Sequence, residues 1–83
     1  MPSRPTIVLY SRPDCHLCDE ARAGLEQMLA EGHGFELREI DIDGDDELFK
    51  RYLERIPVVT LNGEELFEFE VDEAALRRRL SLS

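Results

Sequence analysis

The stretch that decides the predicted fold is YSRPDCHLC, residues 10–18. It continues an apolar run at residues 6–10, which is typical of a buried strand. Pro13 then marks a short turn, and a helical pattern begins directly after the turn. The two cysteines of the chain, Cys15 and Cys18, therefore lie together at a strand-to-helix junction.

The position of these cysteines has a chemical consequence. A side chain at the start of a helix faces free backbone N–H groups and the positive end of the helix dipole. Both stabilise a thiolate at Cys15 relative to the thiol. Cys18 comes one helical turn later on the same side, close enough to attack a mixed disulfide on Cys15. Disulfide exchange requires such a nucleophile with a resolving thiol, so the spacing predicts a redox-active dithiol.

Two cysteines at this spacing can also serve other roles. A static disulfide or two buried, inert thiols would show the same spacing. A zinc site needs about four ligands, and His33 is expected at the far end of the helix from Cys15. A c-type haem needs a histidine directly after the second cysteine, where this chain has Asp19. Residues 41–52 resemble a calcium loop, but they do not have glycine at the sixth position or glutamate at the twelfth. The sequence therefore predicts no metal site and no bound cofactor.

Composition restricts the location and the partners. The chain has 83 residues and a formal net charge of -9, which disfavours nucleic acid and anionic membranes as partners. It has no apolar run of about 18 residues, and residues 1–6 lack the apolar core of a secretory signal. Two cysteines are too few for a disulfide-stapled secreted scaffold. We expect a single domain over residues 1–83, monomeric and cytoplasmic.

Apolar periodicity and turn residues predict the element order βαβαββα. The first two strands should be parallel, and Asn62-Gly63 predicts an antiparallel hairpin between the last two. We therefore expect an α/β fold with a four-stranded mixed sheet flanked by helices. The expected strands cover residues 6–10, 35–42, 58–61 and 64–71, and the expected helices cover residues 16–31, 45–53 and 73–80.

The same spacing predicts which faces are buried. In the last strand, Phe67, Phe69 and Val71 share one face, and Asp72 is a suitable N-cap for the helix that follows. One face of the first helix should be buried, and it carries Leu17, Ala21, Leu25, Met28 and Leu29.

The second strand has an irregular pattern. Phe35 and Leu37 share one phase, whereas Ile40 and Ile42 share the opposite one. Either a bulge lies near residues 38–39 or the strand is covered on both faces.

With these elements in place, the chain resembles small glutaredoxin-like proteins of the thioredoxin-fold superfamily. The resemblance is carried by residues 10–18, by RIPVV at residues 55–59 and by the element order, and it covers residues 6–80. It implies a thioredoxin-like, glutaredoxin-type fold. It also implies the activity of a thiol-disulfide oxidoreductase that serves cell redox homeostasis.

The resemblance implies roles for individual residues. Cys15 would be the catalytic nucleophile and Cys18 the resolving thiol. Pro57 would be the cis proline that faces the cysteines, and the backbone of Ile56 would pair with a bound peptide or glutathione. Arg12 would bind a carboxylate of glutathione or stabilise the thiolate.

The chain departs from the glutaredoxin pattern in two places. Glutaredoxins usually carry Pro-Tyr between the cysteines, and this chain has His16 at the first of these positions. We hypothesise that protonated His16 stabilises the Cys15 thiolate, whereas Asp14 and Asp19 oppose it. Glutaredoxins also bind glutathione with a Gly-Gly-x-x-Asp segment, and this chain has FEVDE at residues 69–73. That bulkier, acidic segment should crowd and repel a glutathione carboxylate.

We expect the substrate to be a disulfide-containing protein or a glutathione mixed disulfide. Glutathione or a reductase protein would then reduce the Cys15–Cys18 disulfide. Two alternatives stay open. In the first, the chain is a redox-inert or redox-sensing interaction module that keeps the fold. In the second, it carries a metal or an iron–sulfur cluster. The presence of only two cysteines and a poor glutathione site disfavours this second alternative.

Overall fold

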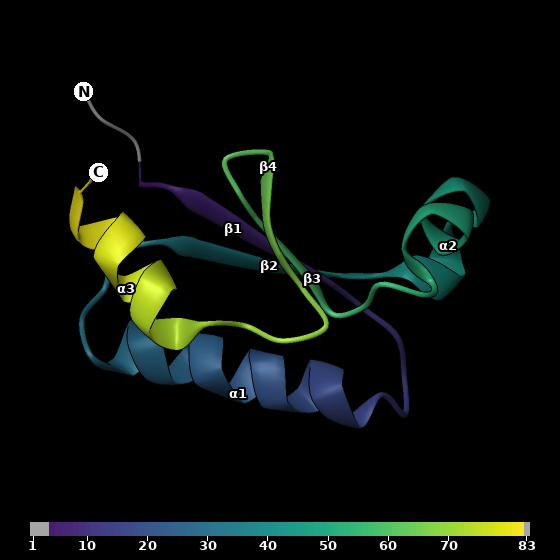
Figure 1. Ribbon diagram of the computed structural model, residues 1–83, viewed down its shortest axis with the longest axis horizontal. Helices are drawn as coiled ribbons and strands as arrows, with labels where there is room; N and C mark the ends of the chain where they lie inside the picture. The colour runs from purple at the N-terminus through teal and green to yellow at the C-terminus, as the bar shows by residue number, and fades with distance from the viewer. Residues whose placement is uncertain (1–3, 83) are drawn as a thin grey trace.

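The computed structural model describes residues 4–82 and shows a mixed sheet with the strand order β2-β1-β3-β4 (Figure 1). β1 pairs with β2 in parallel, and β3 pairs with β1 and β4 in antiparallel fashion. The predicted α/β architecture is therefore confirmed. The strands are β1 (Thr6–Ser11), β2 (Glu36–Asp41), β3 (Val58–Leu61) and β4 (Glu64–Glu68), and the helices are α1 (His16–Ala30), the 3-10 helix η1 (Ile42–Gly44), α2 (Asp46–Tyr52) and α3 (Glu73–Leu82).

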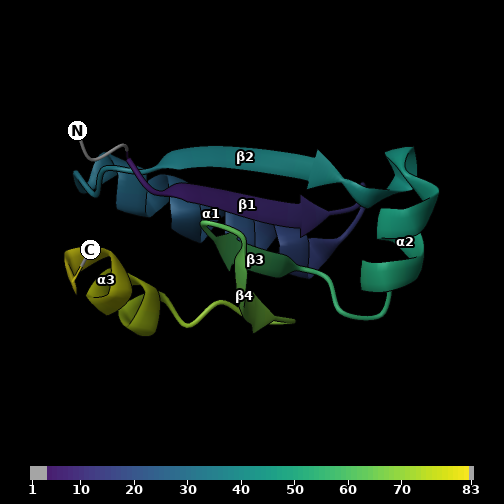
Figure 2. The same cartoon turned by 90° about the horizontal axis from the view of Figure 1, so that it is seen from above.

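Apolar side chains cover both faces of the sheet. Because side chains alternate along a strand, Ile7 and Leu9 of β1 face one cluster and Tyr10 faces the other. The smaller cluster packs on α2, with Ile42, Tyr52 and Val58 buried in it. Figure 2 shows α2 at one end of the sheet, away from α3. The larger cluster joins the sheet to α1 and α3 and consists of Ile7, Leu9, Ala21, Leu25, Met28, Phe35, Val59, Leu61 and Leu76.

This two-sided core decides between the alternatives for the second strand. The β1–β2 register runs without interruption, so the bulge near residues 38–39 is wrong. Phe35 lies in the cluster beneath α1, whereas Ile42 lies in the α2 cluster. Burial on both faces is the correct alternative. The sheet does have an irregularity, but it lies in β3 between Val59 and Thr60, where the pairing with β4 shifts.

The predicted Asn62-Gly63 hairpin and the predicted Asp72 cap both form, and Gly32 and Asp45 lie at the ends of other helices. Asn62 and Gly63 adopt φ angles of 50° and 87°, as a tight hairpin with two left-handed residues requires. Gly32, with a φ of 98°, follows the end of α1. Asp45 and Asp72 each accept a backbone N–H of the helix they cap, at 2.9 Å and 3.0 Å.

The fourth strand is shorter than predicted. It ends at Glu68, because Phe69 adopts a φ of 68°, outside the range of a strand. The N–H of Phe69 donates instead to the carbonyls of Arg55, at 3.1 Å, and Pro57, at 3.0 Å. As a result Phe69 is 48% exposed and does not share a buried face with Phe67.

The buried face of α1 is also narrower than predicted. Leu17 and Leu29 are 43% and 36% exposed, because they flank the buried stripe. The buried residues of the helix are Cys18, Ala21, Leu25 and Met28. Within the described residues, no helix has the length and apolar character needed to cross a membrane.

Candidate redox site

The turn between β1 and α1 places both cysteines at the start of the helix. Cys15 is the N-cap, with extended backbone angles, and its Sγ accepts the N–H of Cys18 at 3.2 Å. This bond satisfies one of the backbone donors that the start of a helix leaves unpaired. Asp14 adopts a φ of 60° just before the cap. Both cysteines are free thiols, so the structure shows the reduced dithiol.

The two sulfurs lie in different environments. Cys15 is half-buried, whereas Cys18 is fully buried. The pKa of the Cys18 thiol is raised from 9.0 to about 12 in total, first by burial, then by the hydrogen bond with the Cys15 side chain and by the charges of Cys15 and Asp19, while a backbone hydrogen bond from Arg12 lowers it. Cys18 is therefore protonated at neutral pH, and Cys15 is the sulfur that is open to solvent.

The Ile56–Pro57 loop lies at the same end of the sheet as the cysteines. Val58 pairs with Tyr10 across β3 and β1, so Pro57 stands beside the end of β1. The Ile56–Pro57 peptide bond is cis, and Pro57 is buried. The N–H of Ile56 donates to the carbonyl of Tyr52 at 3.0 Å. The Ile56 N–H is thus occupied, and a bound peptide would pair with the Ile56 carbonyl unless the hydrogen bond to Tyr52 opens.

Arg12 is engaged with α2 and η1. Its Nε donates to Asp43 Oδ1 at 2.8 Å, and its guanidinium lies 5.3 Å from the centre of the Phe49 ring. Within the described residues, Cys18 alone forms a hydrogen bond with the Cys15 sulfur. The role of Arg12 in binding a carboxylate therefore stays a prediction that requires this ion pair to open.

Within residues 4–82, no hydrogen bond joins either histidine to a cysteine. The His16 side chain is 87% exposed, and its Nε2 lies 3.4 Å from Glu20 Oε1. The effect of His16 on the Cys15 thiolate stays a prediction. His33 lies beyond the other end of α1, with Nε2 3.7 Å from Glu31. In the part of the chain that the structure describes, no group of three or more histidine, cysteine, aspartate or glutamate side chains could hold a metal ion.

One flank of the first turns of α1 carries charges that neutralise one another. Arg22 donates to Glu39 at 2.7 Å and to Asp19 at 2.9 Å, and the buried Ser11 hydroxyl donates to Glu39 at 2.7 Å. These bonds raise the pKa of Arg22 and lower that of Glu39. A shallow hollow lies on this flank, and we call it the paired flank. Its lining residues are Ser11, Arg12, Pro13, Asp19, Arg22, Glu39 and Asp41.

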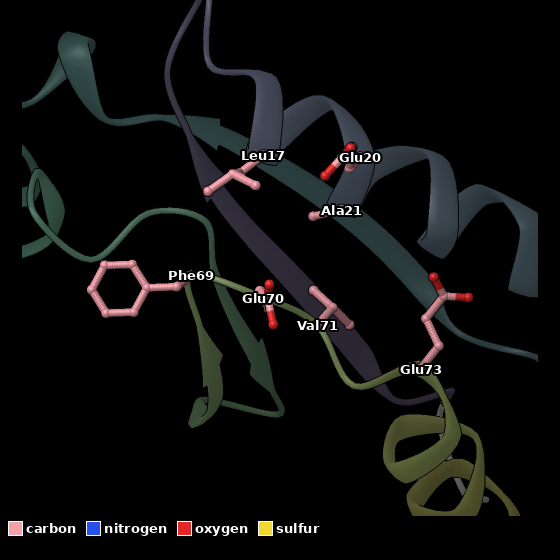
Figure 3. A pocket seen from close by; sticks show the side chains of 7 residues that line it. All are labelled: Leu17, Glu20, Ala21, Phe69, Glu70, Val71 and Glu73. Atoms are coloured by element: carbon pink, nitrogen blue, oxygen red, sulfur yellow. The ribbon is translucent and has the colours of Figure 1, made fainter.

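The other flank carries a groove of about 220 Å³. Figure 3 shows Leu17, Glu20 and Ala21 on α1 and Phe69, Glu70 and Val71 on the segment across from it, with Glu73 at the start of α3. Of the three large apolar residues exposed in the described chain, Leu17 and Phe69 line this groove. We call it the acidic groove, and it is lined by Leu17, Glu20, Ala21, Phe69, Glu70, Val71 and Glu73.

Sequence reasoning did not assign these groove residues to the site. The available signal was the FEVDE segment at residues 69–73, which interrupts the glutaredoxin pattern. The contribution of Leu17 was hidden because helical spacing predicted it to be buried.

Comparisons with known proteins show the family and the fold of the chain. The family model described as Glutaredoxin-like domain (DUF836) matches residues 6–81. Uncharacterized protein Rv0508 of Mycobacterium tuberculosis is 35% identical over 86 residues, which cover 98% of this chain and 88% of that protein.

Solved structures extend the likeness. The solution NMR structure of protein Ne2328 from Nitrosomonas europaea is 32% identical, with a TM-score of 0.78 over 95% of this chain and 94% of that one. The oxidized form of mitochondrial thioredoxin 3 from Saccharomyces cerevisiae has a TM-score of 0.70 over 95% of this chain and 78% of that one. Since its identity is 12%, that likeness concerns the fold alone. The chain thus belongs to the family described as Glutaredoxin-like domain (DUF836), and its fold is thioredoxin-like.

Proposed function

We propose that this chain is a thiol-disulfide oxidoreductase that acts through Cys15 and Cys18 and serves cell redox homeostasis. The observation that carries the proposal is the 3.2 Å hydrogen bond from the Cys18 N–H to the Cys15 sulfur. This bond places a half-exposed thiol where backbone N–H groups and the helix dipole stabilise a thiolate. The second thiol lies buried one turn behind it.

The proposed exchange has two steps. The Cys15 thiolate attacks one sulfur of the substrate disulfide, the substrate S–S bond breaks, and the departing sulfur takes a proton from water. Cys18 then gives up its proton and attacks the Cys15 sulfur, which releases the second substrate thiol and leaves a Cys15–Cys18 disulfide. Two electrons pass from the dithiol to the substrate.

The substrate of the exchange is a disulfide, and the exchange needs no resident cofactor. The proposed substrate is a disulfide-containing protein or a glutathione mixed disulfide, and glutathione or a reductase protein restores the dithiol. In this proposal Pro57 and Ile56 form one wall of the substrate site, and the chain acts in the cytoplasm.

A second candidate is a redox-inert or redox-sensing interaction module. The observation that favours it is the segment at residues 69–73, FEVDE, which has no glycine pair. A weak glutathione site would slow the reduction of a Cys15–Cys18 disulfide by glutathione.

A redox titration separates the two candidates. The chain is equilibrated in glutathione buffers between about -270 and -120 mV, quenched with an alkylating reagent and analysed by intact mass. We expect conversion between the dithiol and an internal disulfide within this range, and no internal disulfide in the Cys15→Ser control. Thiols that stay reduced throughout, or a disulfide that never opens, would contradict the oxidoreductase and support the module.

A further inference from the structure

The acidic groove begins at the helical turn that carries the dithiol. Leu17 lies between Cys15 and Cys18 in the sequence and lines the groove. Its side chain is 43% exposed, and that of Phe69 across the groove is 48% exposed. Solvent-exposed apolar side chains on both walls of a hollow favour an apolar occupant.

The carboxylates of the groove are weakly compensated within the chain. Glu70 forms no ion pair within residues 4–82, and Glu20 contacts only the exposed His16 imidazole, at 3.4 Å. Glu73 lies 3.6 Å from the Arg77 guanidinium, which donates its closer bonds to Glu31 at 2.9 and 3.0 Å. The groove therefore presents negative charge that the rest of the chain leaves largely unmatched.

The Glu73 carboxylate lies against Gly24, a residue of α1 that has no side chain. A Cβ at Gly24 of α1 would lie 2.7 Å from Glu73 Oε2, so the glycine makes room for this carboxylate against the helix. The acid thus sits at the junction of α1 and α3, at the end of the groove away from the dithiol (Figure 3).

We propose that the acidic groove binds an extended protein segment that flanks the substrate disulfide and carries lysine or arginine together with a large apolar residue. The inference rests on the proposed exchange at Cys15 and names the class of substrate for it. The cationic groups meet Glu20, Glu70 and Glu73, and the apolar residue contacts Leu17 and Phe69. Oxidised glutathione, which is anionic, is a poor occupant of the same groove.

The test uses the full chain with Cys18→Ala, so that Cys15 forms a mixed disulfide that is not resolved. Two five-residue peptides serve as probes, each with a central cysteine activated by thionitrobenzoate and a leucine at each end. Two lysines flank the cysteine in one peptide and two glutamates in the other. The rate of thionitrobenzoate release gives the second-order rate constant, because each attack of the Cys15 thiolate expels one thionitrobenzoate anion. Oxidised glutathione is assayed in parallel by intact mass.

We expect the lysine peptide to react about tenfold faster than the glutamate peptide at low ionic strength. The ratio should fall towards unity at about 0.5 M salt, where exposed charges are screened. In the Glu70→Gln, Glu73→Gln variant the ratio should fall about threefold or more. The matched control is Glu26→Gln, Glu36→Gln, which removes the same net charge from exposed residues outside the groove and should keep the ratio.

The outcomes distinguish this inference from the proposed function. If both peptides react at equal rates, or if the groove variant and the control change the ratio equally, the groove does not select the substrate and the inference is wrong. If Cys15 reacts with neither peptide nor glutathione, the oxidoreductase itself is wrong and the inference falls with it. The inference would also be wrong if Cys15 reacted faster with oxidised glutathione than with the lysine peptide.

Discussion

The two flanks of the first turns of α1 differ in how their charges are matched. On the paired flank, Arg22 joins Glu39 and Asp19, and Arg12 joins Asp43. In the acidic groove on the other flank, Glu70 lacks an ion-pair partner within the described residues, and apolar side chains lie open to solvent. Successive residues of a helix point in directions about 100° apart. Asp19 and Glu20 therefore line different flanks, although they are adjacent in the sequence.

This difference separates residues that hold the site from residues that are available to a partner. Charges that are matched inside a chain contribute to its stability and offer little to a ligand, whereas unmatched charges cost little to leave in water and remain free to bind. Cys18 belongs to the first group, because Arg12 and Asp19 of the paired flank contribute to its surroundings. Each prediction below tests this division.

The largest expected effect concerns the reactivity of Cys18. In a Cys15→Ser variant at pH 8, alkylation of Cys18 should be about a hundredfold or more slower in the folded chain than in the same chain unfolded in urea. Burial is the largest cause of the rise in the Cys18 pKa and remains in this variant, although the contribution of Cys15 is lost, and each pKa unit lowers the thiolate fraction tenfold. Timed quenching with iodoacetamide and intact mass gives both rates. Folded and unfolded rates within tenfold of each other would show that Cys18 is not held on the paired flank.

The same shift gives the direction of a pH dependence. Because the pKa of Cys18 is higher in the folded chain, its contribution to stability is complete below pH 9 and is lost as the pH rises towards 12. Urea unfolding at several pH values should show this decline for the Cys15→Ser variant. A Cys15→Ser, Cys18→Ala variant is the control and should lack this component.

Next in size is the stability of the paired flank itself. Arg22→Met should lower the free energy of unfolding by about 1–2 kcal/mol, because it leaves the Glu39 carboxylate, whose side chain is 33% exposed, without its charged donor. The control is Arg38→Met, whose exposed pair with Glu36 should be worth less than about 1 kcal/mol. Equal losses in the two variants, measured by urea unfolding, would remove the distinction between the paired flank and an ordinary surface pair.

This pair also predicts a dependence on acid. Arg22 lowers the pKa of Glu39 below 4.5, so the stability that the pair supplies is present above pH 4.5 and is lost as the pH falls through the lower, folded value. The Arg22→Met variant should therefore lose less stability than the wild-type chain between about pH 5 and pH 2.

A smaller effect on stability is expected in the acidic groove. Phe69→Asn should change the free energy of unfolding by less than about 1 kcal/mol, because asparagine tolerates the positive φ that phenylalanine does not, which offsets the loss of a half-exposed ring. The same variant should react several-fold more slowly with the leucine-containing lysine peptide. A large loss of stability with an unchanged rate would assign Phe69 to the fold and not to the groove.

The sequence predicted the dithiol turn because everything that forms it is local. Strand, turn and helix start lie within residues 6–18, and the position of Cys15 at the helix start follows from that order. The cis proline followed from the resemblance alone. The ion pairs of the paired flank could not be predicted, since Arg22 and Glu39 come together only when β2 packs beside β1.

The acidic groove was missed for a related reason. The alternation of Phe67, Phe69 and Val71 is a normal strand pattern, but long-range hydrogen bonds from the Phe69 N–H to Arg55 and Pro57 end the strand early. That change turns Phe69 outward and makes residues 69–73 a wall of the groove. Tertiary contacts thus overrode the local pattern at the segment that lines the acidic groove.

The smallest expected effect concerns Gly24, where the groove meets α3. Alanine at this helix-interior position should stabilise α1 by up to about 1 kcal/mol, but its Cβ would displace the Glu73 carboxylate, which lies 2.7 Å away. Because the displaced atoms are the end of a flexible side chain, we expect a net gain of a few tenths of a kcal/mol. Urea unfolding of Gly24→Ala, Glu73→Ala and the double variant isolates the contact as a coupling energy.

The sign and size of this coupling show how firmly the groove is built. A coupling of a few tenths of a kcal/mol means that Glu73 moves aside readily, as expected of an acid that is available to a partner. A coupling above about 1 kcal/mol would mean that Glu73 is fixed against α1 as firmly as Glu39 is fixed by Arg22. The acidic groove would then be as rigid as the paired flank, and the contrast between the two would lie in net charge alone.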